Sequence, residues 1–422
     1  MAHILLRHRD IENIHQIDVY LANGGYEALK KAVSMDRGEL IELVKKANVK
    51  GRGGAGFPAG IKWSFVPKGD GPKYVVINTD ESETGTFKDR ELSTYNPHQI
   101  IEGALIAAYA IGANRVFNYF RGEFMDIGVN FEQALKDARA QGFIGKDICG
   151  SGWDCEFFAH FGAGAYICGE ETALLNSLMG KIGQPWSKPP FPAVEGLYGK
   201  PTVVNNTETL CNIPPIVVNG PDWYLDLGDD KSPGPKIVCL SGHVEKPGNY
   251  EVIMGKTTYR ELIYDMAGGV RGGKQMKAML PSGGSGPVVT AEALDAPISF
   301  DGLQPFGSMM GSASVIVMDE DTDMVWAALK ATHFFKHESC GKCTPCREGT
   351  FWLDKLLHRI YHGHGTPRDL EVLQSVARNI QGKCLCALGE FATSPVISFV
   401  KHFMPEFQAK VAQARPEAVP AD

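Results

Sequence analysis

The sequence predicts an α/β protein in three parts: an α/β domain over residues 1–235, a small β-grasp (ubiquitin-like) domain over 236–320 and a four-helix bundle over 321–422. Two changes of pattern support this division. Helices and strands alternate up to residue 235, a strand–hairpin–helix–strand series follows, and the pattern after Asp321 is helical throughout. A chain of 422 residues, 44% of them hydrophobic, can form several buried cores.

The first part has the alternation typical of an α/β domain. An amphipathic helical pattern ends at a run of glycines, and a short apolar run typical of a buried strand follows. Two proline-rich stretches, 185–201 and 214–235, are expected to be loops, the second of them a linker. The other expected elements are helices over 38–49, 97–112 and 129–140 and strands over 73–78 and 115–120.

The second and third parts follow in 236–320 and 321–422. In the β-grasp part we expect a strand from residue 236, a hairpin around Pro247-Gly248, a helix over 259–266 and a strand over 312–318. Four helical patterns then predict a bundle with a cysteine-rich loop at one end. These helices are expected over 322–337, 347–362, 368–380 and 394–404.

Charge and hydropathy exclude some classes of protein. A net charge of −7 and a pI near 6.0 argue against a nucleic-acid-binding protein, which would have a basic face. The apolar stretch 100–113 is too short to span a bilayer and contains Glu102. The first ten residues do not resemble a signal peptide. We therefore expect a cytoplasmic protein with no direct membrane insertion, which reaches a membrane only through partners.

The cysteine pattern is the most specific chemical signal. Cys340, Cys343 and Cys346 have the spacing C-x₂-C-x₂-C, and Cys386 follows 40 positions later. Three thiolates in one loop and a fourth from elsewhere suit a [4Fe–4S] cluster. A zinc site is the alternative, although its ligands usually form two pairs. Disulfides within so tight a loop are disfavoured. Spacing alone does not decide between Cys386 and Cys384 as the fourth ligand.

A run of glycines provides a candidate binding site for a nucleotide or flavin. Four glycines between residues 51 and 56 allow backbone N–H groups to approach a phosphate or a flat ring closely. The run follows a helical pattern and not a strand, so it is not an ordinary Rossmann fingerprint. A flexible turn is the alternative. The candidate residues here are Gly51, Arg52, Gly53, Gly54, Phe57, Lys62 and Phe65.

Polar residues that follow strands or glycines extend this candidate site. The string Asn78–Glu83 comes directly after a strand of parallel type, where open α/β sheets bind ligands. Carboxylates there can accept hydrogen bonds from ribityl or ribose hydroxyls, and a solvated acidic loop is the alternative. The segment from Tyr166 to Glu171 could bind an anion or a flavin edge, or could simply begin a helix. The amides of Asn205 and Asn206 could hydrogen-bond a flavin ring or a phosphate, and a cap or a turn is the alternative. The candidate residues in these two segments are Tyr166, Gly169, Glu170, Glu171, Asn205 and Asn206.

Five strings together closely resemble one family, in that family's order and over nearly the whole chain. They are Gly51–Gly60, Asn78–Glu83, Tyr166–Glu171, Glu338–Gly349 and Cys386–Glu390. The family is the NADH-oxidising flavoprotein component (the F subunit) of respiratory complex I, NADH:quinone oxidoreductase, an oxidoreductase of the translocase class. The resemblance implies an FMN-binding Rossmann-like domain, a β-grasp domain and a four-helix bundle carrying a [4Fe–4S] cluster.

The resemblance also implies roles for individual residues. FMN is expected to contact Gly51, Arg52, Gly53, Gly54, Lys62, Asn78, Asp80, Glu81, Ser82, Gly169, Glu170, Asn205 and Asn206. NADH is expected to stack over the flavin and to contact Phe57, Phe65, Glu83, Tyr166, Glu171 and Lys188. The family keeps Cys-x-Leu-Gly after its fourth cluster ligand, which favours Cys386 over Cys384. The ligands are then Cys340, Cys343, Cys346 and Cys386.

The expected activity is transfer of a hydride from NADH to FMN and of single electrons from FMN to the cluster. The implied partners are a small [2Fe–2S] protein (the E-type subunit) and a large iron–sulfur protein (the G-type subunit), with quinone as the final acceptor. These partners would hold the chain at the cytoplasmic side of the inner membrane. The alternative is the homologous diaphorase subunit of a soluble NAD-linked hydrogenase or formate dehydrogenase. A zinc-stabilised scaffold would leave the glycine and acidic strings unexplained.

Overall fold

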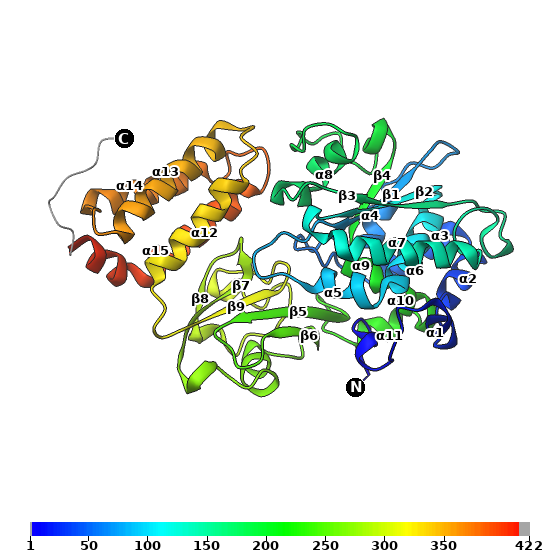
Figure 1. The fold of residues 1–422 in the computed structure, drawn as a ribbon, viewed down its shortest axis with the longest axis horizontal. Helices are drawn as coiled ribbons and strands as arrows, with labels where there is room; N and C mark the ends of the chain where they lie inside the picture. Colours follow the sequence, from blue (N-terminus) through cyan, green and yellow to red (C-terminus); the bar gives the residue numbers. More distant parts are fainter. Residues whose placement is uncertain (1, 413–422) are drawn as a thin grey trace.

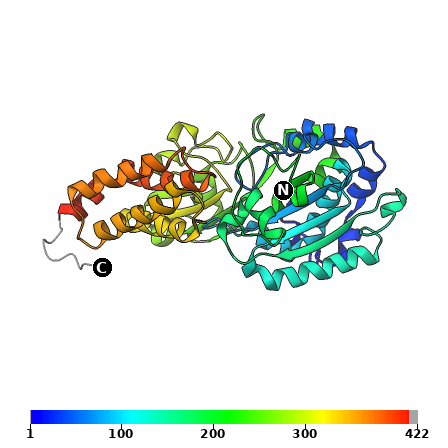
Figure 2. The same cartoon turned by 90° about the horizontal axis from the view of Figure 1, so that it is seen from above.

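The computed structural model describes residues 2–412 and shows three parts (Figure 1). The α/β part and the helical bundle lie at opposite ends, and the β-grasp part touches both. A mixed α/β chain with a β-grasp part and a C-terminal helical part confirms the predicted fold class. Helices flank the first sheet on both sides in the view from above (Figure 2).

The α/β part contains a parallel four-stranded sheet in the order β3-β2-β1-β4. Its strands are β1 (Tyr74–Thr79), β2 (Arg115–Phe120), β3 (Glu156–Phe161) and β4 (Thr202–Asn206). The chain moves outward from β1 through β2 to β3 and then returns to the other side of β1. The strand order therefore reverses between β1 and β4, and ligands bind open α/β sheets at such a reversal.

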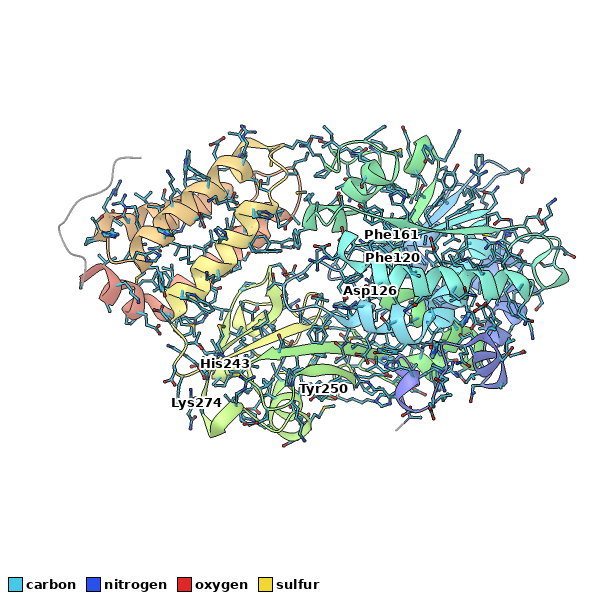
Figure 3. The ribbon with its side chains drawn as sticks, in the orientation of Figure 1. Phe120, Asp126, Phe161, His243, Tyr250 and Lys274 are labelled. Atoms are coloured by element: carbon cyan, nitrogen blue, oxygen red, sulfur yellow. The ribbon has the colours of Figure 1, made fainter. Side chains whose placement is uncertain are left out.

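Both faces of this sheet are buried, as parallel sheets require. Val75 and Ile77 of β1 pack into the core of the α/β part. Tyr74 and Val76, on the opposite face, belong to a second core that continues into the bundle through Phe335. Aromatic side chains also join neighbouring strands, since Phe120 and Phe161 stack with their ring centroids 5.7 Å apart (Figure 3).

The helices of the α/β part agree with the sequence prediction where the predicted helical pattern was long. The helix α6 is almost entirely buried because nearly every residue in it is apolar or small. The helices are α1 (Ile17–Ala22), α2 (Glu27–Val33), α3 (Arg37–Lys46), α4 (Ala59–Ser64), α5 (Lys88–Tyr95), α6 (Pro97–Ile111), α7 (Met125–Ala140), α8 (Glu171–Leu178), α9 (Thr207–Cys211), α10 (Ile213–Asn219) and α11 (Pro221–Asp226).

The prediction of a loop over 214–235 is wrong for its first half. The helices α10 and α11 occupy residues 213–226, and each has proline in its first turn. Proline is tolerated there because the N–H groups of the first turn have no partner within the helix. The prolines therefore mark helix starts and not an irregular linker.

The β-grasp part has a five-stranded sheet in the order β6-β5-β9-β7-β8. Its strands are β5 (Pro235–Gly242), β6 (Gly248–Ile253), β7 (Met276–Gly284), β8 (Val289–Thr290) and β9 (Ser314–Asp319). The predicted hairpin at Pro247-Gly248 is confirmed by the antiparallel pairing of β5 with β6. The predicted helix is present as a shorter helical segment, Glu261–Met266.

The bundle consists of four helices, as predicted. They are α12 (Met324–Glu338), α13 (Thr344–Tyr361), α14 (Pro367–Ile380) and α15 (Leu388–Ala412). The loop with the first three cysteines joins α12 to α13, and Cys386 lies just before α15. The loop between α12 and α13 lies at the end of the bundle that faces the α/β part (Figure 1), and all four cysteines pack against the core that includes Tyr74 and Val76 of β1.

A buried ionic network joins the α/β part to the β-grasp part. The carboxylate of Glu208, on α9, accepts hydrogen bonds from Lys236 Nζ at 2.6 Å and from Ile237 N at 2.8 Å, both on β5. It also lies 3.0 Å from Lys88 Nζ of α5, and all three charged side chains are at most 1% exposed. Burial would raise the pKa of Glu208, but the two lysines lower it below its ordinary value.

The first residues of the chain form a second connection between the same two parts. Backbone N–H groups of residues 4–6 donate to the carboxylate of Glu251 on β6 at 2.7–3.0 Å. Glu91 on α5 accepts hydrogen bonds from His8 and Arg9, and also from Asn249 on β6. Burial opposes ionisation of Glu91, but these hydrogen bonds lower its pKa to about 2.

This geometry makes the stability of the protein depend on Glu91. Glu91→Gln should lower the free energy of unfolding at pH 7 by about 3 kcal/mol, because each unit of pKa shift corresponds to about 1.4 kcal/mol. The lowered pKa means that the contribution is present above the ordinary value of 4.5 and is lost as the pH falls toward 2. The free energy of unfolding, obtained from the first unfolding transition in urea for the wild-type and Glu91→Gln proteins between pH 7 and pH 3, measures this difference.

Glu27→Gln is the matched control, because Glu27 forms an exposed pair with Lys30. Such a pair contributes about 0.5 kcal/mol or less. Equal effects of the two substitutions, or a Glu91→Gln effect that does not shrink at low pH, would contradict the assignment.

Candidate functional site

The strings singled out in the sequence meet at the reversal point between β1 and β4. Asn78 and Asn206 are paired in register at the carboxyl ends of these strands. Asn78 Nδ2 donates to the carbonyl oxygen of Gly169 at 2.8 Å, which brings the third string to the same place. A Cβ on Gly53 would lie 3.1 Å from Cβ of Asn206, so the glycine run packs against the end of β4. Four segments distant in sequence thus meet at one place.

The glycine run has the backbone expected of a cradle. Gly54 has φ of +129°, a conformation that residues with a side chain rarely adopt. Gly51 N donates to the carbonyl oxygen of Phe57 at 3.0 Å, which closes the run into a loop. Donors and close backbone approach are therefore available at the carboxyl end of the sheet, where a phosphate or a flat ring can bind.

Arg52 does not present its side chain to this site. Its guanidinium group is completely buried and donates at 2.8 Å to the Tyr224 hydroxyl and to the Pro233 carbonyl oxygen. Its backbone N–H donates to Thr209 Oγ1. The Arg52 charge therefore fastens the glycine run to α11 and to the segment before β5, while its backbone N–H fastens the run to α9. Contact between Arg52 and a cofactor stays a prediction.

The acidic string divides into groups with different partners. Glu81 accepts hydrogen bonds from Asp89 N and Arg90 N at the start of α5, so its carboxylate anchors that helix. Asp80 accepts a hydrogen bond from Ser82 Oγ at 2.6 Å. Burial raises the pKa of Asp80 to about 7, against the opposing effect of Ser82. Asp80 thus titrates close to neutral pH.

Glu83, four residues past the end of β1, forms a half-buried pair with Tyr166. The Tyr166 hydroxyl donates to Glu83 Oε2 at 2.9 Å, and Ser285 N of the β-grasp part donates to Glu83 Oε1 at 3.1 Å. Burial raises the pKa of Glu83 to about 7, and these hydrogen bonds oppose the rise. The carboxylate is therefore held in one orientation by two parts of the molecule.

Two lysines and two glutamates border the mouth of the site. Lys188 Nζ lies 2.6 Å from Glu171 Oε1 and 3.2 Å from Glu170 Oε1, and Lys62 Nζ lies 3.4 Å from Glu171 Oε2. Glu170 also accepts hydrogen bonds from backbone N–H groups of residues 172 and 173 and so caps α8. Burial would raise the pKa of Glu171, but Lys62 and Lys188 lower it.

Aromatic and amide side chains complete the candidate set. Phe57 and Phe65 are exposed, with ring centroids 6.1 Å apart, and so present a free apolar surface near the glycine run. Asn205 Oδ1 accepts a hydrogen bond from Trp63 Nε1. Asn206 Nδ2 donates to Asp89 Oδ2 at 2.6 Å. The last contact adds Asp89, which sequence reasoning missed because nothing local indicates a partner 117 residues away.

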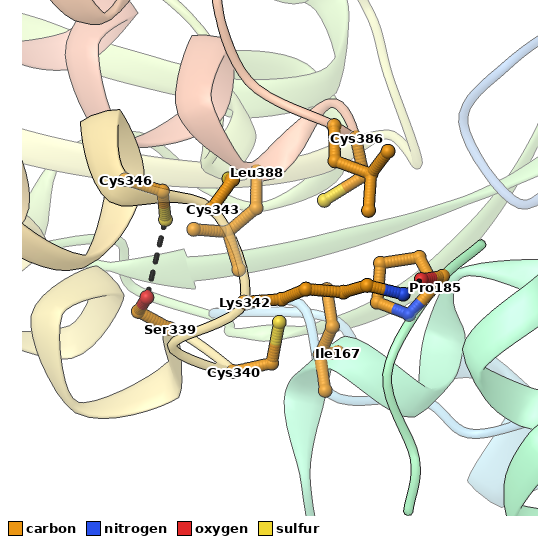
Figure 4. Close-up of a pocket in the computed structure, with 10 residues that line it drawn as sticks. Ile167, Pro185, Ser339, Cys340, Lys342, Cys343, Cys346, Cys386 and Leu388 are labelled. Atoms are coloured by element: carbon orange, nitrogen blue, oxygen red, sulfur yellow. Dashed lines mark hydrogen bonds between the residues drawn. The ribbon is translucent and has the colours of Figure 1, made fainter. Parts of the chain in front are cut away.

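The four predicted cysteines surround one pocket at the end of the bundle (Figure 4). The sulfur atoms of Cys340, Cys346 and Cys386 point into this space, and Ser339 Oγ lies 3.2 Å from Cys346 Sγ. Burial raises the pKa of Cys346 to about 11 and that of Cys386 to about 12, so iron binding has to displace their protons. In residues 2–412, no three His, Cys, Asp or Glu side chains are arranged to hold a single metal ion.

Cys384 is close to the same thiols but does not line the pocket. The pocket is lined by Leu385, Cys386 and Leu388 from this segment. Cys384 Sγ instead lies 3.7 Å from the carbonyl oxygen of Ile380 at the end of α14. This placement supports Cys386 as the ligand.

No helix within residues 2–412 combines the length and the hydropathy needed to cross a bilayer.

Three family models match consecutive parts of the chain. The Nuo51 FMN-binding domain matches residues 44–215, and the SLBB domain matches residues 236–317. The NADH-ubiquinone oxidoreductase-F iron–sulfur binding region matches residues 326–410. The glycine, acidic and asparagine strings fall in the first match, and the four cysteines fall in the last.

Several curated proteins are similar over most of their length. The F 2 subunit of NADH-quinone oxidoreductase from Rhizobium meliloti is 50% identical over 414 residues, which is 98% of this chain and 98% of that protein. The F subunit of NADH-quinone oxidoreductase from Mycobacterium bovis is 51% identical over 392 residues, covering 92% of this chain and 88% of that protein.

A solved structure is similar at lower identity. It is a NAD⁺-reducing [NiFe]-hydrogenase in the H₂-reduced state, with a TM-score of 0.82 and 36% identity. The match covers 91% of this chain but only 64% of the hydrogenase chain. The curated relatives are about 50% identical to this chain over nearly its full length, and the FMN-binding and iron–sulfur family models match it as well. The chain therefore belongs to the F-subunit family of NADH-quinone oxidoreductases.

Proposed function

We propose that this chain is the NADH-oxidising flavoprotein subunit of an NADH:quinone oxidoreductase, with FMN and a [4Fe–4S] cluster. The observation that carries the proposal is the proximity of two sites. Tyr166 lies three residues before Gly169, whose carbonyl oxygen accepts a hydrogen bond from Asn78 at the end of β1. Its ring packs on Phe334 and Phe335 of α12, which leads directly into the cysteine loop. A hydride-accepting site and a one-electron site are thus adjacent within one chain.

The donor set around the glycine run suits FMN. Glycines allow the close approach that a flavin requires, and amides and a lysine offer hydrogen bonds to the ring, ribityl chain and phosphate. When bound, FMN accepts a hydride from NADH and gives up electrons one at a time. The residues that would hold it are Gly51, Gly53, Gly54, Lys62, Asn78, Asp80, Ser82, Gly169, Glu170, Asn205 and Asn206, with Arg52 contributing only its backbone.

The mouth of the cradle suits NADH. Exposed Phe57 and Phe65 offer apolar faces for stacking, and Lys188 offers a cation for a phosphate. Glu83 and Tyr166 would orient the nicotinamide, while Glu171 would lie near the adenosine ribose. No general base is required for hydride transfer, so these carboxylates bind and orient the nucleotide.

The remaining assignments follow from the same proposal. Cys340, Cys343, Cys346 and Cys386 would ligate the cluster. We propose domain boundaries at residues 235 and 320, so that the cofactor sites lie in 1–235 and 321–422. Partner proteins of the E type and G type would receive the electrons and hold the chain at the inner membrane.

The second candidate is the diaphorase subunit of a soluble hydrogenase or formate dehydrogenase. The similarity to a NAD⁺-reducing hydrogenase supports that possibility. Identity to the F-subunit relatives is higher, at 50% against 36%, and covers those proteins nearly completely. Co-purification with the E-type and G-type proteins would favour complex I, whereas co-purification with hydrogenase components would favour the alternative.

The two candidate cluster cysteines can be separated by substitution. Cys386→Ser should abolish the [4Fe–4S] signal in EPR spectra of the reduced protein and leave FMN bound, because the two sites lie in different parts of the fold. Cys384→Ser, the matched control two residues away, should keep the signal. Loss of the signal in the Cys384 variant alone would reverse the assignment.

Removing the cluster should leave oxidation of NADH intact and stop electron transfer to the partner protein. Cys343→Ala is expected to retain NADH oxidation with ferricyanide, an inorganic one-electron oxidant that can take electrons without the cluster. The same variant should fail to reduce the [2Fe–2S] partner protein. Equal loss of both activities at unchanged FMN content would contradict the proposed order of electron transfer.

The charges around Glu171 should determine the choice between NADH and NADPH. The 2′-phosphate of NADPH is repelled by a carboxylate, by about 3 kcal/mol for unit charges roughly 6 Å apart at an effective dielectric constant near 20. Glu171→Gln removes this repulsion and also removes one carboxylate partner of Lys62 and of Lys188, both of which could then attract the phosphate. We expect kcat/KM for NADPH to rise at least about tenfold, with little change for NADH.

Steady-state ferricyanide assays with both nucleotides measure the ratio. Glu195→Gln is the control, because Glu195 is an exposed carboxylate in the segment that follows Lys188. An unchanged ratio of NADPH to NADH activity in Glu171→Gln would remove Glu171 from this role.

A further inference from the structure

Tyr166 is held at three points, and two of them belong to the helical bundle. Its hydroxyl donates to Glu83, as described above. Its ring packs edge-on against Phe334 and Phe335 of α12, with centroids 5.3 Å and 5.8 Å away. Its backbone N–H donates to Glu338 Oε2 at 3.0 Å. The residue is therefore fixed by the element that leads into the cysteine loop.

Glu338 is well placed to hold this contact. It is the last residue of α12, and its side chain is only 15% exposed. Tyr166 is the first residue of a short helical turn, Tyr166–Gly169, whose preceding residue provides no side-chain cap. The first N–H groups of a helical turn lack partners within it, so a carboxylate from another element can satisfy one of them. Glu338 is thus an inter-domain cap for the segment that contains Tyr166.

The β-grasp part closes the arrangement from the opposite side. Gly283 has φ of +68°, and a Cβ at this position would lie 2.8 Å from Glu83 Oε1. The backbone therefore approaches the carboxylate closely enough for Ser285 N to donate to it. Glu83 thus accepts one hydrogen bond from Tyr166 of the α/β part and one from Ser285 of the β-grasp part. The orientation of Tyr166 in turn depends on Glu338 of the bundle.

We propose that Glu338 is a positioning residue for nucleotide binding: by fixing Tyr166, it holds the Glu83 carboxylate in the orientation that receives the nicotinamide nucleotide. This inference rests on the proposed function, and it extends the site into the bundle by a residue outside the set proposed to contact the cofactors. The cause is conformational. A site whose side chains already have the binding orientation loses no free energy in ordering them when the ligand binds. If only a fraction of the molecules has that orientation, the apparent affinity falls in proportion to that fraction.

The test uses the complete protein with both cofactors bound and NAD⁺ as the probe. Glu338→Ala leaves the Tyr166 N–H without its acceptor and should raise the Kd for NAD⁺ about tenfold, at unchanged FMN content and unchanged [4Fe–4S] EPR intensity. Glu338→Gln retains an acceptor oxygen and should recover most of the affinity. Glu348→Ala is the matched control, because this exposed carboxylate near the same loop pairs with its chain neighbour Arg347.

A double-mutant cycle with Tyr166→Phe distinguishes positioning from a general structural role. That substitution removes the hydroxyl that links Tyr166 to Glu83, so Glu338→Ala should then have at most about a threefold effect on Kd. Additive effects, or loss of cluster signal in Glu338→Ala, would overturn the inference while leaving the proposed function intact. Failure of the wild-type protein to oxidise NADH would overturn the proposed function itself.

Discussion

The buried charge of Glu208 is the constraint on which the arrangement of the first two parts depends. A carboxylate that is completely removed from water has to be paired, and its partners are Lys88 of α5 and Lys236 of β5. Separating the two parts would leave charges buried without partners. Glu208 lies in the first turn of α9, the helix that Asn206 caps at the end of β4. The helix α9, which begins next to Asn206 at the candidate site, is thus also the helix that fixes the position of the β-grasp part.

This anchoring explains why a β-grasp sheet can contribute to a site at the end of another sheet. Because β5 is tied to α9, the loop after β7 reaches Glu83 in a fixed register, and Gly283 allows the approach. The bundle reaches the same place through a continuous hydrophobic core that includes Val76, Leu174 and Phe335. The site is therefore a junction of three packed units and not a property of the α/β part alone.

Some of this arrangement is encoded locally, and the sequence predicts it well. The strand 115–120 and the helix α6 have strong apolar patterns, and the cysteine spacing indicates four ligands from two segments. Long-range pairing is not encoded locally. Arg52 lies in a glycine run typical of a binding site, yet its charge is buried against Tyr224, 172 residues away. Ser285 and Glu338 likewise have no neighbouring signal, since their partners lie in other domains.

The contact between residues 4–6 and Glu251 has a consequence for biosynthesis. These N–H groups emerge early from the ribosome, but their acceptor lies 245 to 247 residues further along the chain. Domains generally fold in order during translation, and such distant contacts form late. The α/β part consequently stays incomplete at its first segment until β6 has been made. A ribosome that stalls before residue 251 would hold a nascent chain whose opening segment is unpaired and open to proteases or chaperones.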